Sequence, residues 1–158
     1  MGSLPTETML AAQYNTAKNK VEVNEVPIPR YYRNAMALPD GMDMITAAPL
    51  FCAGITAYHC VKGCNLVRGQ WIAIIGCGGL GHLAVQYAKA MGLKVIGLDI
   101  SDAQLEDAKA LGADATYNTK TDIEYEAKIK KLTEGGCHAA AVFSASHVAY
   151  GDAPRTLR

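Results

Sequence analysis

The second half of the chain alternates between short apolar runs and longer amphipathic segments. Residues 71–75 form a continuous apolar run, which is typical of a strand buried on both faces of a parallel sheet. Apolar runs at 94–99 and 139–143 and a weaker one at 115–117 predict three more strands. Amphipathic segments lie between these runs, and they predict helices over 82–91, 102–111 and 122–133. This order predicts a parallel sheet with right-handed crossovers.

The first part of the chain has a different pattern. Valines take mostly alternate positions in residues 20–26, which predicts a half-buried strand. A single helix is expected from Thr46 to about Val61. Thr46 is expected to cap this helix, and Pro49 is expected to lie in its first turn.

Composition and charge exclude several classes of function. The 158 residues include 15 basic and 15 acidic side chains, so a zero net charge argues against a nucleic-acid partner. The longest apolar runs end well before the roughly 20 residues of a membrane span, so no membrane association is expected. The five cysteines are odd in number and contain no C-x-x-C pair, which favours a reduced, cytoplasmic protein without disulfides.

A glycine-rich loop directly follows the first strand predicted for the parallel sheet. Its sequence is Gly76-Cys77-Gly78-Gly79-Leu80-Gly81. In a dinucleotide-binding loop, the first glycine permits a tight turn and the second lets the backbone approach a pyrophosphate. The third lets the following helix pack closely on the strand. The N-terminus of that helix offers free N–H groups to the phosphates. The alternative is a glycine-rich turn kept only for close packing.

Asp99 is the acidic residue that a dinucleotide-binding glycine loop requires further along the chain. It lies 23 residues after Gly76, at the end of the second strand predicted for the parallel sheet. A carboxylate there accepts hydrogen bonds from the hydroxyl groups of the adenosine ribose. It repels a 2′-phosphate, so NAD is expected rather than NADP.

These residues resemble the zinc-dependent medium-chain alcohol dehydrogenases, particularly the fungal and bacterial type. Residues 48–58 resemble the linker helix of that family, and residues 76–92 resemble its cofactor loop and the following helix. Residues 9–29 are similar to the first strands of its catalytic domain. The resemblance implies an α/β chain with a partial Rossmann fold. About four parallel strands in the order 3-2-1-4 would have helices on both faces, with a short N-terminal β remnant.

The resemblance also implies a domain organisation. Residues 1–45 would be the remnant of the catalytic domain, residues 46–65 the linker helix, and residues 66–158 a partial NAD-binding domain. The family's Cys-His-x-Asp and Gly-His-Glu segments and its four-cysteine zinc lobe do not occur here. The chain is therefore expected to be internally and C-terminally truncated. It would retain the NAD-binding half of an enzyme that transfers hydride between an alcohol and NAD with the help of zinc.

The resemblance assigns three further residues. Cys52 matches the position of the third catalytic zinc ligand, but the other two ligands have no counterpart, so zinc binding is doubtful. Gln104 takes the place of a lysine that often contacts the cofactor, and Ser144 lies in a segment that passes near the nicotinamide. No catalytic residue is assigned, and the family reaction is not expected from this chain alone.

The expected partners follow from the same features. A small-molecule dinucleotide would bind at the glycine loop. The fourth predicted strand would be an exposed apolar edge, which favours a homo-oligomer or a complementing chain. The alternative function is a non-redox nucleotide-binding or interaction module, or a small-molecule enzyme repurposed on the Rossmann remnant.

Overall fold

The computed structural model describes residues 8–15, 20–27 and 41–158. The chain divides into two compact units, Met1–Met42 and Asp43–Arg158. In the first unit, strands β1 (Thr8–Asn15) and β2 (Lys20–Pro27) form an antiparallel pair. The strand predicted at 20–26 is therefore confirmed, and its partner is the strand immediately before it.

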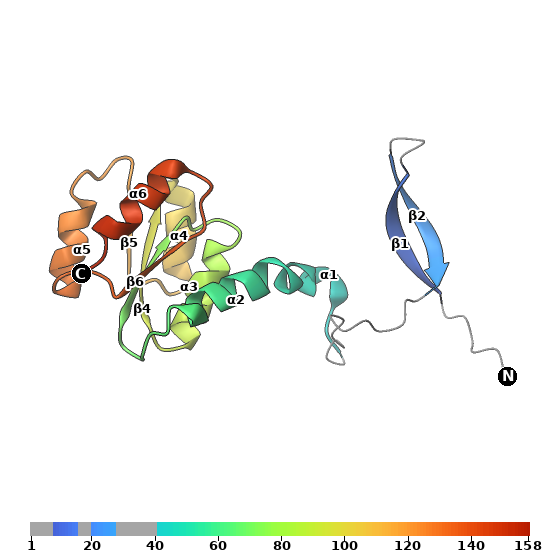
Figure 1. Cartoon of the computed structure of the whole chain (residues 1–158), viewed down its shortest axis with the longest axis horizontal. Coiled ribbons are helices and arrows are strands. Elements are labelled where there is room, and N and C mark those ends of the chain that lie inside the picture. The colour runs from blue at the N-terminus through green and yellow to red at the C-terminus, as the bar shows by residue number, and fades with distance from the viewer. Residues whose placement is uncertain (1–7, 16–19, 28–40) are drawn as a thin grey trace. The chain divides into compact units, whose positions relative to one another are not determined.

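The second unit contains a four-stranded parallel sheet (Figure 1). Its strands lie in the order β5-β4-β3-β6, and all three pairs are parallel. In order of sequence this is 3-2-1-4, so the predicted topology is confirmed. The strands are β3 (Trp71–Ile75), β4 (Lys94–Asp99), β5 (Ala115–Asn118) and β6 (Ala139–Val142).

Helices cover both faces of this sheet, as alternation along the central strand β3 requires. Ile72 and Ile74 pack with residues of α2, α3 and α4 in one hydrophobic cluster. Ala73 and Ile75 point the other way and pack with α5 and α6. The helices are α2 (Ala53–Gly63), α3 (Gly81–Ala90), α4 (Asp102–Ala110), α5 (Tyr125–Thr133) and α6 (His147–Arg155).

The single helix expected from Thr46 to Val61 is wrong. Helix α1 (Met44–Ala47) and the 3-10 helix η1 (Ala48–Phe51) precede α2, and the backbone at Cys52 leaves the helical region with φ −122° and ψ −74°. Pro49 has no N–H to continue an α-helical ladder, which explains the short 3-10 turn at this place.

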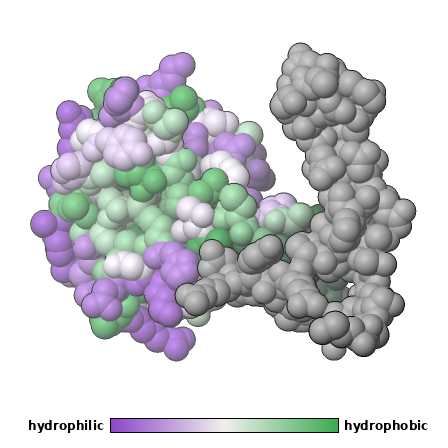
Figure 2. Space-filling model, turned by 45° about the vertical axis from the view of Figure 1, so that its right-hand side comes forward, coloured by the Kyte–Doolittle hydropathy of each residue, from purple (hydrophilic) through white to green (hydrophobic). Residues whose placement is uncertain are grey.

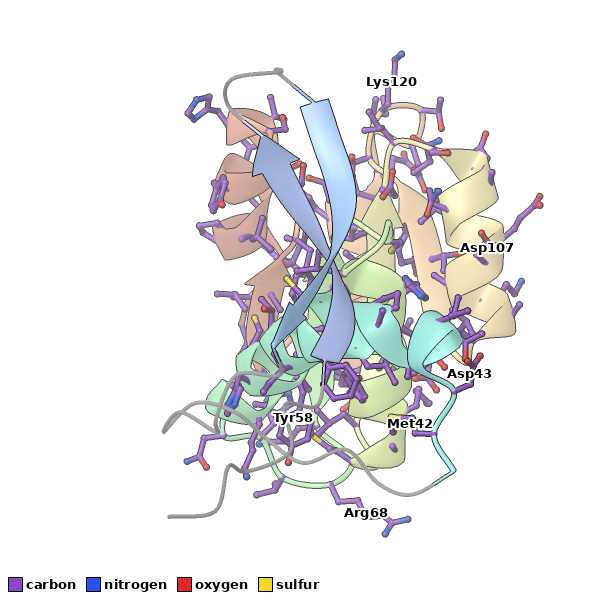
Figure 3. The ribbon with its side chains drawn as sticks, turned by 90° about the vertical axis from the view of Figure 1, so that its right-hand side faces the viewer. Met42, Asp43, Tyr58, Arg68, Asp107 and Lys120 are labelled. Carbon is purple, nitrogen blue, oxygen red and sulfur yellow. The ribbon has the colours of Figure 1, made fainter. Side chains whose placement is uncertain are left out.

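Thr46 is also not the helix cap. Asp43 stands just before α1 (Figure 3), and its carboxylate accepts hydrogen bonds from the N–H groups of Ile45 and Thr46 at 3.2 and 3.3 Å. The hydroxyl of Thr46 donates to the same carboxylate at 2.7 Å. These three bonds lower the pKa of Asp43 below its usual value, because each one favours the ionised carboxylate.

Helix α6 is absent from the predicted elements. Its sequence contains Gly151 and Pro154, two residues that usually mark the end of a helix. Ala149 and Ala153 nevertheless pack against the second hydrophobic cluster. Tertiary packing therefore forms a helix that the local sequence does not favour.

Beyond α6, the chain returns to the start of β6. The N–H of Cys137 donates to the carbonyl of Thr156 at 2.8 Å, and the N–H of Arg158 donates to the carbonyl of Cys137 at 3.2 Å. This pairing is a parallel β-bridge between Cys137 and Leu157. Within the described residues, β6 has one strand neighbour, β3, and is an edge strand of the sheet.

Part of the apolar surface is exposed. Figure 2 shows a face on which hydrophobic residues gather in the middle, with hydrophilic residues around them. On η1 and α2 the exposed large apolar side chains are Leu50, Phe51, Ile55 and Tyr58. None of the helices in the described residues combines the length and the apolar character that crossing a membrane requires.

Candidate functional site

The glycine loop begins where β3 ends. Gly76 has φ +89°, and its N–H donates to the carbonyl of Leu98 at 2.7 Å. A Cβ at this position would lie 3.1 Å from the carbonyl carbon of Phe143. A positive φ and a close neighbouring backbone both favour glycine here, as the sequence pattern predicts.

The other glycines of the loop differ sharply in the space around them. A Cβ on Gly81 would lie only 1.8 Å from the carbonyl oxygen of Gly76, so only glycine lets α3 start this close to β3. Gly78 and Gly79 have no atom within 4 Å of an added Cβ. The fold therefore requires Gly81 but leaves open space beside Gly78 and Gly79.

Three successive N–H groups lie at the N-terminus of α3. They belong to Gly78, Gly79 and Leu80, and they have no hydrogen-bond acceptor among the described residues. The helix contributes the positive end of its dipole at the same place. Free N–H groups at a helix N-terminus form a site for phosphate oxygens.

Asp99 ends β4, and three backbone N–H groups hold its carboxylate. Oδ2 accepts a hydrogen bond of 2.7 Å from the N–H of Cys77, which ties the glycine loop to β4. Oδ1 accepts from the N–H groups of Ile100 at 2.7 Å and Ser101 at 3.0 Å. A carboxylate has about four acceptor positions, so Oδ2 keeps one for a ligand donor.

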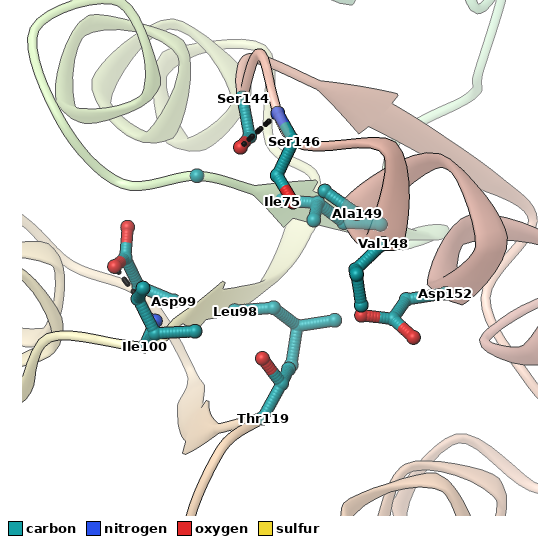
Figure 4. A pocket seen from close by; sticks show the side chains of 11 residues that line it. Ile75, Leu98, Asp99, Ile100, Thr119, Ser144, Ser146, Val148, Ala149 and Asp152 are labelled. Carbon is teal, nitrogen blue, oxygen red and sulfur yellow. Dashed lines mark hydrogen bonds between the residues drawn. The ribbon is translucent and has the colours of Figure 1, made fainter.

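A hollow opens between the carboxyl ends of β3, β4 and β6 (Figure 4). Gly76, Asp99 and Ser144 all line it, so three residues predicted from separate parts of the sequence lie around one space. Ser144 also accepts a hydrogen bond of 3.2 Å from the N–H of Ser146, which fixes the turn that leads into α6.

Gln104 lines a neighbouring hollow. This second space lies between the start of α3 and helix α4, and one of its α4 residues, Asp107, is labelled in Figure 3. Gly78 and Gly79 line it together with Gln104. The structure therefore brings Gln104 to the open side of the glycine loop.

The loop after β5 forms another wall of the first hollow. The side-chain amide of Asn118 donates to the carboxylate of Asp102 at 2.6 Å and to the carbonyl of Ile100 at 3.2 Å. Its side-chain oxygen accepts from the N–H of Lys120 at 3.0 Å. This network fixes the position of Thr119, which lines the hollow.

Several lining residues were not identified from the sequence, among them Ile100, Thr119, Val148 and Asp152. Ile100 and Thr119 follow the ends of parallel strands, so the rule that ligands bind at these ends gives a signal for them. Val148 and Asp152 lie on α6, which the sequence did not predict. Asp152 lies near Tyr125, whose pKa is raised to about 12 by burial first and then by the Asp152 charge.

The described residues do not form a metal site. They contain no group of three or more His, Cys, Asp or Glu side chains that could hold a metal ion. Cys52 is exposed at the junction of η1 and α2 and lines neither hollow. Burial, and then the charge of Asp99, raises the pKa of Cys77 to about 12, so this thiol stays protonated. The donor set of the described residues does not fit zinc.

Comparison with known sequences identifies the family. Residues 79–158 match the model of a family described as zinc-binding dehydrogenase, and the chain belongs to that family. The alcohol dehydrogenase of Geobacillus stearothermophilus is 46% identical over 121 residues, which are 77% of this chain and 35% of that protein. The alcohol dehydrogenase of Schizosaccharomyces pombe is 40% identical over 121 residues, covering 76% of this chain and 35% of that protein. The chain spans about a third of the length of these curated relatives.

Solved structures agree with this family. The alcohol dehydrogenase of Aeropyrum pernix has a TM-score of 0.68 and 38% identity, and the match covers 76% of this chain and 36% of that one. A quinone oxidoreductase of Pseudomonas syringae pv. Tomato has a TM-score of 0.73 and 27% identity, covering 87% and 41%. The expected alcohol dehydrogenase-like Rossmann fold is therefore confirmed. The family implies a nicotinamide dinucleotide as the class of cofactor.

Proposed function

We propose that residues 66–158 bind NAD or NADH as the cofactor-binding part of an alcohol dehydrogenase-like oxidoreductase. The observation that carries this proposal is the link between Asp99 and the glycine loop, a 2.7 Å hydrogen bond from the N–H of Cys77 to Oδ2. This bond holds the ribose-binding carboxylate beside the free N–H groups that precede α3. Under this proposal, the Asp99 carboxylate and the free N–H groups are already held in place before the dinucleotide binds.

Each part of the site has a separate task. The N–H groups of Gly78, Gly79 and Leu80 would bind the pyrophosphate, with the open space beside the two glycines letting it approach the backbone. Asp99 would accept a hydroxyl of the adenosine ribose through Oδ2. A 2′-phosphate would bring negative charge against this carboxylate, which favours NAD over NADP.

Gln104 and Ser144 complete the proposed contacts. Gln104 lies at the hollow beside Gly78 and Gly79, where its amide can donate a hydrogen bond to the cofactor. Ser144 lies beside Gly76 at the hollow between the strand ends. The bound dinucleotide supplies hydride chemistry, and the described residues position it and order its phosphates and ribose.

The proposed reaction class is the oxidation of an alcohol or the reverse reduction. Relatives that share 46% and 40% identity with this chain are named alcohol dehydrogenases, and the chain spans about a third of their length. The described residues do not gather the ligands of a catalytic zinc ion. We therefore propose that cofactor binding resides in this chain and that hydride transfer requires groups beyond those described.

We also propose a cytoplasmic location and assembly through the edge of the sheet. The five cysteines are free, which supports a reducing compartment such as the cytoplasm. The edge position of β6 supports pairing with a second copy or a complementing chain. Analytical ultracentrifugation at several concentrations tests the assembly. A monomer at every concentration would rule out self-association through this edge.

Calorimetric titration of the whole chain with NADH tests the proposed binding. We expect saturable binding to the wild type and a loss of affinity of about tenfold or more in Gly78→Val, because the valine blocks the pyrophosphate. Space beside Gly78 means that this variant should keep its melting temperature.

A matched variant separates a blocked pyrophosphate site from a general effect of adding a valine to the protein. Gly63→Val also places a side chain where nothing lies within 4 Å of the Cβ, but it lies on α2 and lines neither hollow. We expect it to bind NADH like the wild type. A folded wild type without NADH binding, or equal affinities in wild type and Gly78→Val, would overturn the proposal.

A further inference from the structure

A buried carboxylate on α6 lines the hollow on the side away from the glycine loop. Asp152 is only 7% exposed, yet it lines the same space as Asp99 and Gly76. Figure 4 shows its carboxylate directed toward Leu98 and Val148 rather than out of the molecule. An acidic group at this depth loses hydration and needs a donor to replace it.

Two protein groups approach this carboxylate, and neither fills all of its acceptor positions. Its ion-pair partner is Arg155, whose guanidinium lies 4.0 Å away, is largely exposed, and also approaches Glu126 at 3.4 Å. The hydroxyl of Tyr125 also donates to this carboxylate, and burial, the charge of Asp152 and this hydrogen bond together raise the pKa of Tyr125 to about 12. Since a carboxylate has about four acceptor positions, Asp152 keeps acceptor capacity toward the hollow.

Helix stability does not account for Asp152 either. The residue lies in the second half of α6, where the negative end of the helix dipole disfavours an acidic side chain. Both its burial and its position in the helix therefore oppose a carboxylate. A charged group that does not stabilise its helix and lines a cavity is a candidate for ligand binding.

Two apolar side chains stand at the mouth of the same hollow. Ile100 follows β4 and is 67% exposed, and Val148 lies in the first turn of α6 and is 72% exposed. Both line the hollow, with Leu98 deeper inside. Aliphatic side chains from two separate elements offer apolar contact to an aromatic ring, and Asp152 offers an acceptor to that ring's edge.

We propose that Asp152 selects the base of the bound dinucleotide by accepting a hydrogen bond from an exocyclic amino group. This inference rests on the dinucleotide binding proposed above. Adenine carries an amino donor at the six position of its purine ring. Hypoxanthine carries a carbonyl oxygen there, which would face the carboxylate without a proton between them. The site would therefore favour a 6-aminopurine over a 6-oxopurine.

The test compares two dinucleotides on the whole chain. NADH and reduced nicotinamide hypoxanthine dinucleotide share the same ribose, pyrophosphate and nicotinamide, so they differ only in the base. Calorimetric titration of the wild type should give a dissociation constant about tenfold lower for NADH, as expected for one hydrogen bond to a charged group. In Asp152→Asn the preference should fall to about twofold or less, because an amide can present either an acceptor or a donor.

Arg155→Gln is the matched control. It removes the charge nearest to Asp152 without altering a residue that lines the hollow, and it should keep the preference for NADH. Equal affinities of the wild type for the two dinucleotides would overturn the role of Asp152 and leave the proposed function intact. An unchanged preference in Asp152→Asn would do the same. Failure of both dinucleotides to bind the folded wild type would overturn both proposals.

Discussion

The two ends of the parallel sheet use their polar groups in different ways. At the amino end, the N–H of Trp71 meets Nδ1 of His138 at 3.2 Å, and the guanidinium of Arg158 meets Nε2 at 3.1 Å. The same guanidinium also donates to the carbonyl of Thr133 at 3.4 Å. Polar groups at this end therefore lie against other protein groups.

At the carboxyl end, polar groups are left over. The N–H groups that precede α3 have no acceptor among the described residues, and Asp99 keeps one acceptor position on Oδ2. Asp152 lines the hollow and keeps acceptor positions beyond those that Arg155 and Tyr125 use. The comparison teaches that the same four strands place protein–protein polar contacts at one end and free polar groups at the other, where we propose ligand binding. This division follows from parallel strands, whose carboxyl ends all lie on one side.

The largest expected effect is on stability, and it comes from replacing a glycine at the amino end of the sheet. Gly136 lies at the amino end with φ +130°, and a Cβ there would lie 2.4 Å from the carbonyl carbon of Leu157. Gly136→Ala should lower the free energy of unfolding by about 3 kcal/mol, combining a strained backbone with overpacking. This corresponds to a fall in melting temperature of about 10 °C.

Its effect on binding should be the reverse of that of Gly78→Val. Folded Gly136→Ala should bind NADH like the wild type, whereas Gly78→Val should keep its stability and lose affinity. Melting followed by circular dichroism and titration with NADH measure both quantities. A loss of affinity in the folded Gly136→Ala protein would show that the two ends are not independent.

Much of this carboxyl end could be predicted from sequence, because its signals are local. Continuous apolar runs predict the strands. The spacing from Gly76 to Asp99 predicts that the glycine loop and this carboxylate lie at the same end of neighbouring strands. The Cys52 break and the Asp43 cap were missed, since a 3-10 turn at Pro49 and competition between two capping residues depend on small energy differences.

The amino end and α6 could not be predicted in the same way. The contact of His138 with Trp71 joins residues 67 positions apart, and no periodicity records it. Helix α6 contains Gly151 and Pro154, and packing on the sheet overrides their local preference. Asp152 therefore could not be placed at the hollow, because its helix was not expected.

An intermediate effect concerns pH at the amino end. Burial, and then the charge of Arg158, lowers the pKa of His138 below its usual value of 6.5. The unfolded chain therefore takes up this proton at a higher pH than the folded chain does. The contribution to stability is fully present above about pH 6.5 and is lost as pH falls from there toward the lower pKa of the folded state.

The expected result is a melting temperature that falls between pH 7.5 and pH 5.5. A neutral imidazole has one acceptor nitrogen, so each tautomer accepts from only one of the two donors, Trp71 at Nδ1 or Arg158 at Nε2. Protonation removes that acceptor. In His138→Gln the decline should be smaller, since glutamine does not titrate. His147→Gln, on an exposed residue of α6, is the control and should decline like the wild type. Parallel curves for wild type and His138→Gln would refute a role of His138.

The smallest expected effect compares one buried cysteine from each end. Cys77 and Cys137 are fully buried, and burial is the main cause that raises the pKa of each thiol to about 12. Cys52 is exposed, so iodoacetamide at pH 8 should modify it first. Peptide mass spectrometry over time gives the rate at each cysteine.

Adding NADH should then separate the two buried thiols. Cys77 lies in the glycine loop, so bound NADH should slow its modification by suppressing local opening there. Cys137 pairs with Leu157 at the amino end, and its rate should change less. The exposed Cys52 serves as an internal control whose rate should stay constant. Equal protection of Cys77 and Cys137 would mean that both ends of the sheet open together in one cooperative step. The two ends would then differ in their ligand contacts but not in their local opening.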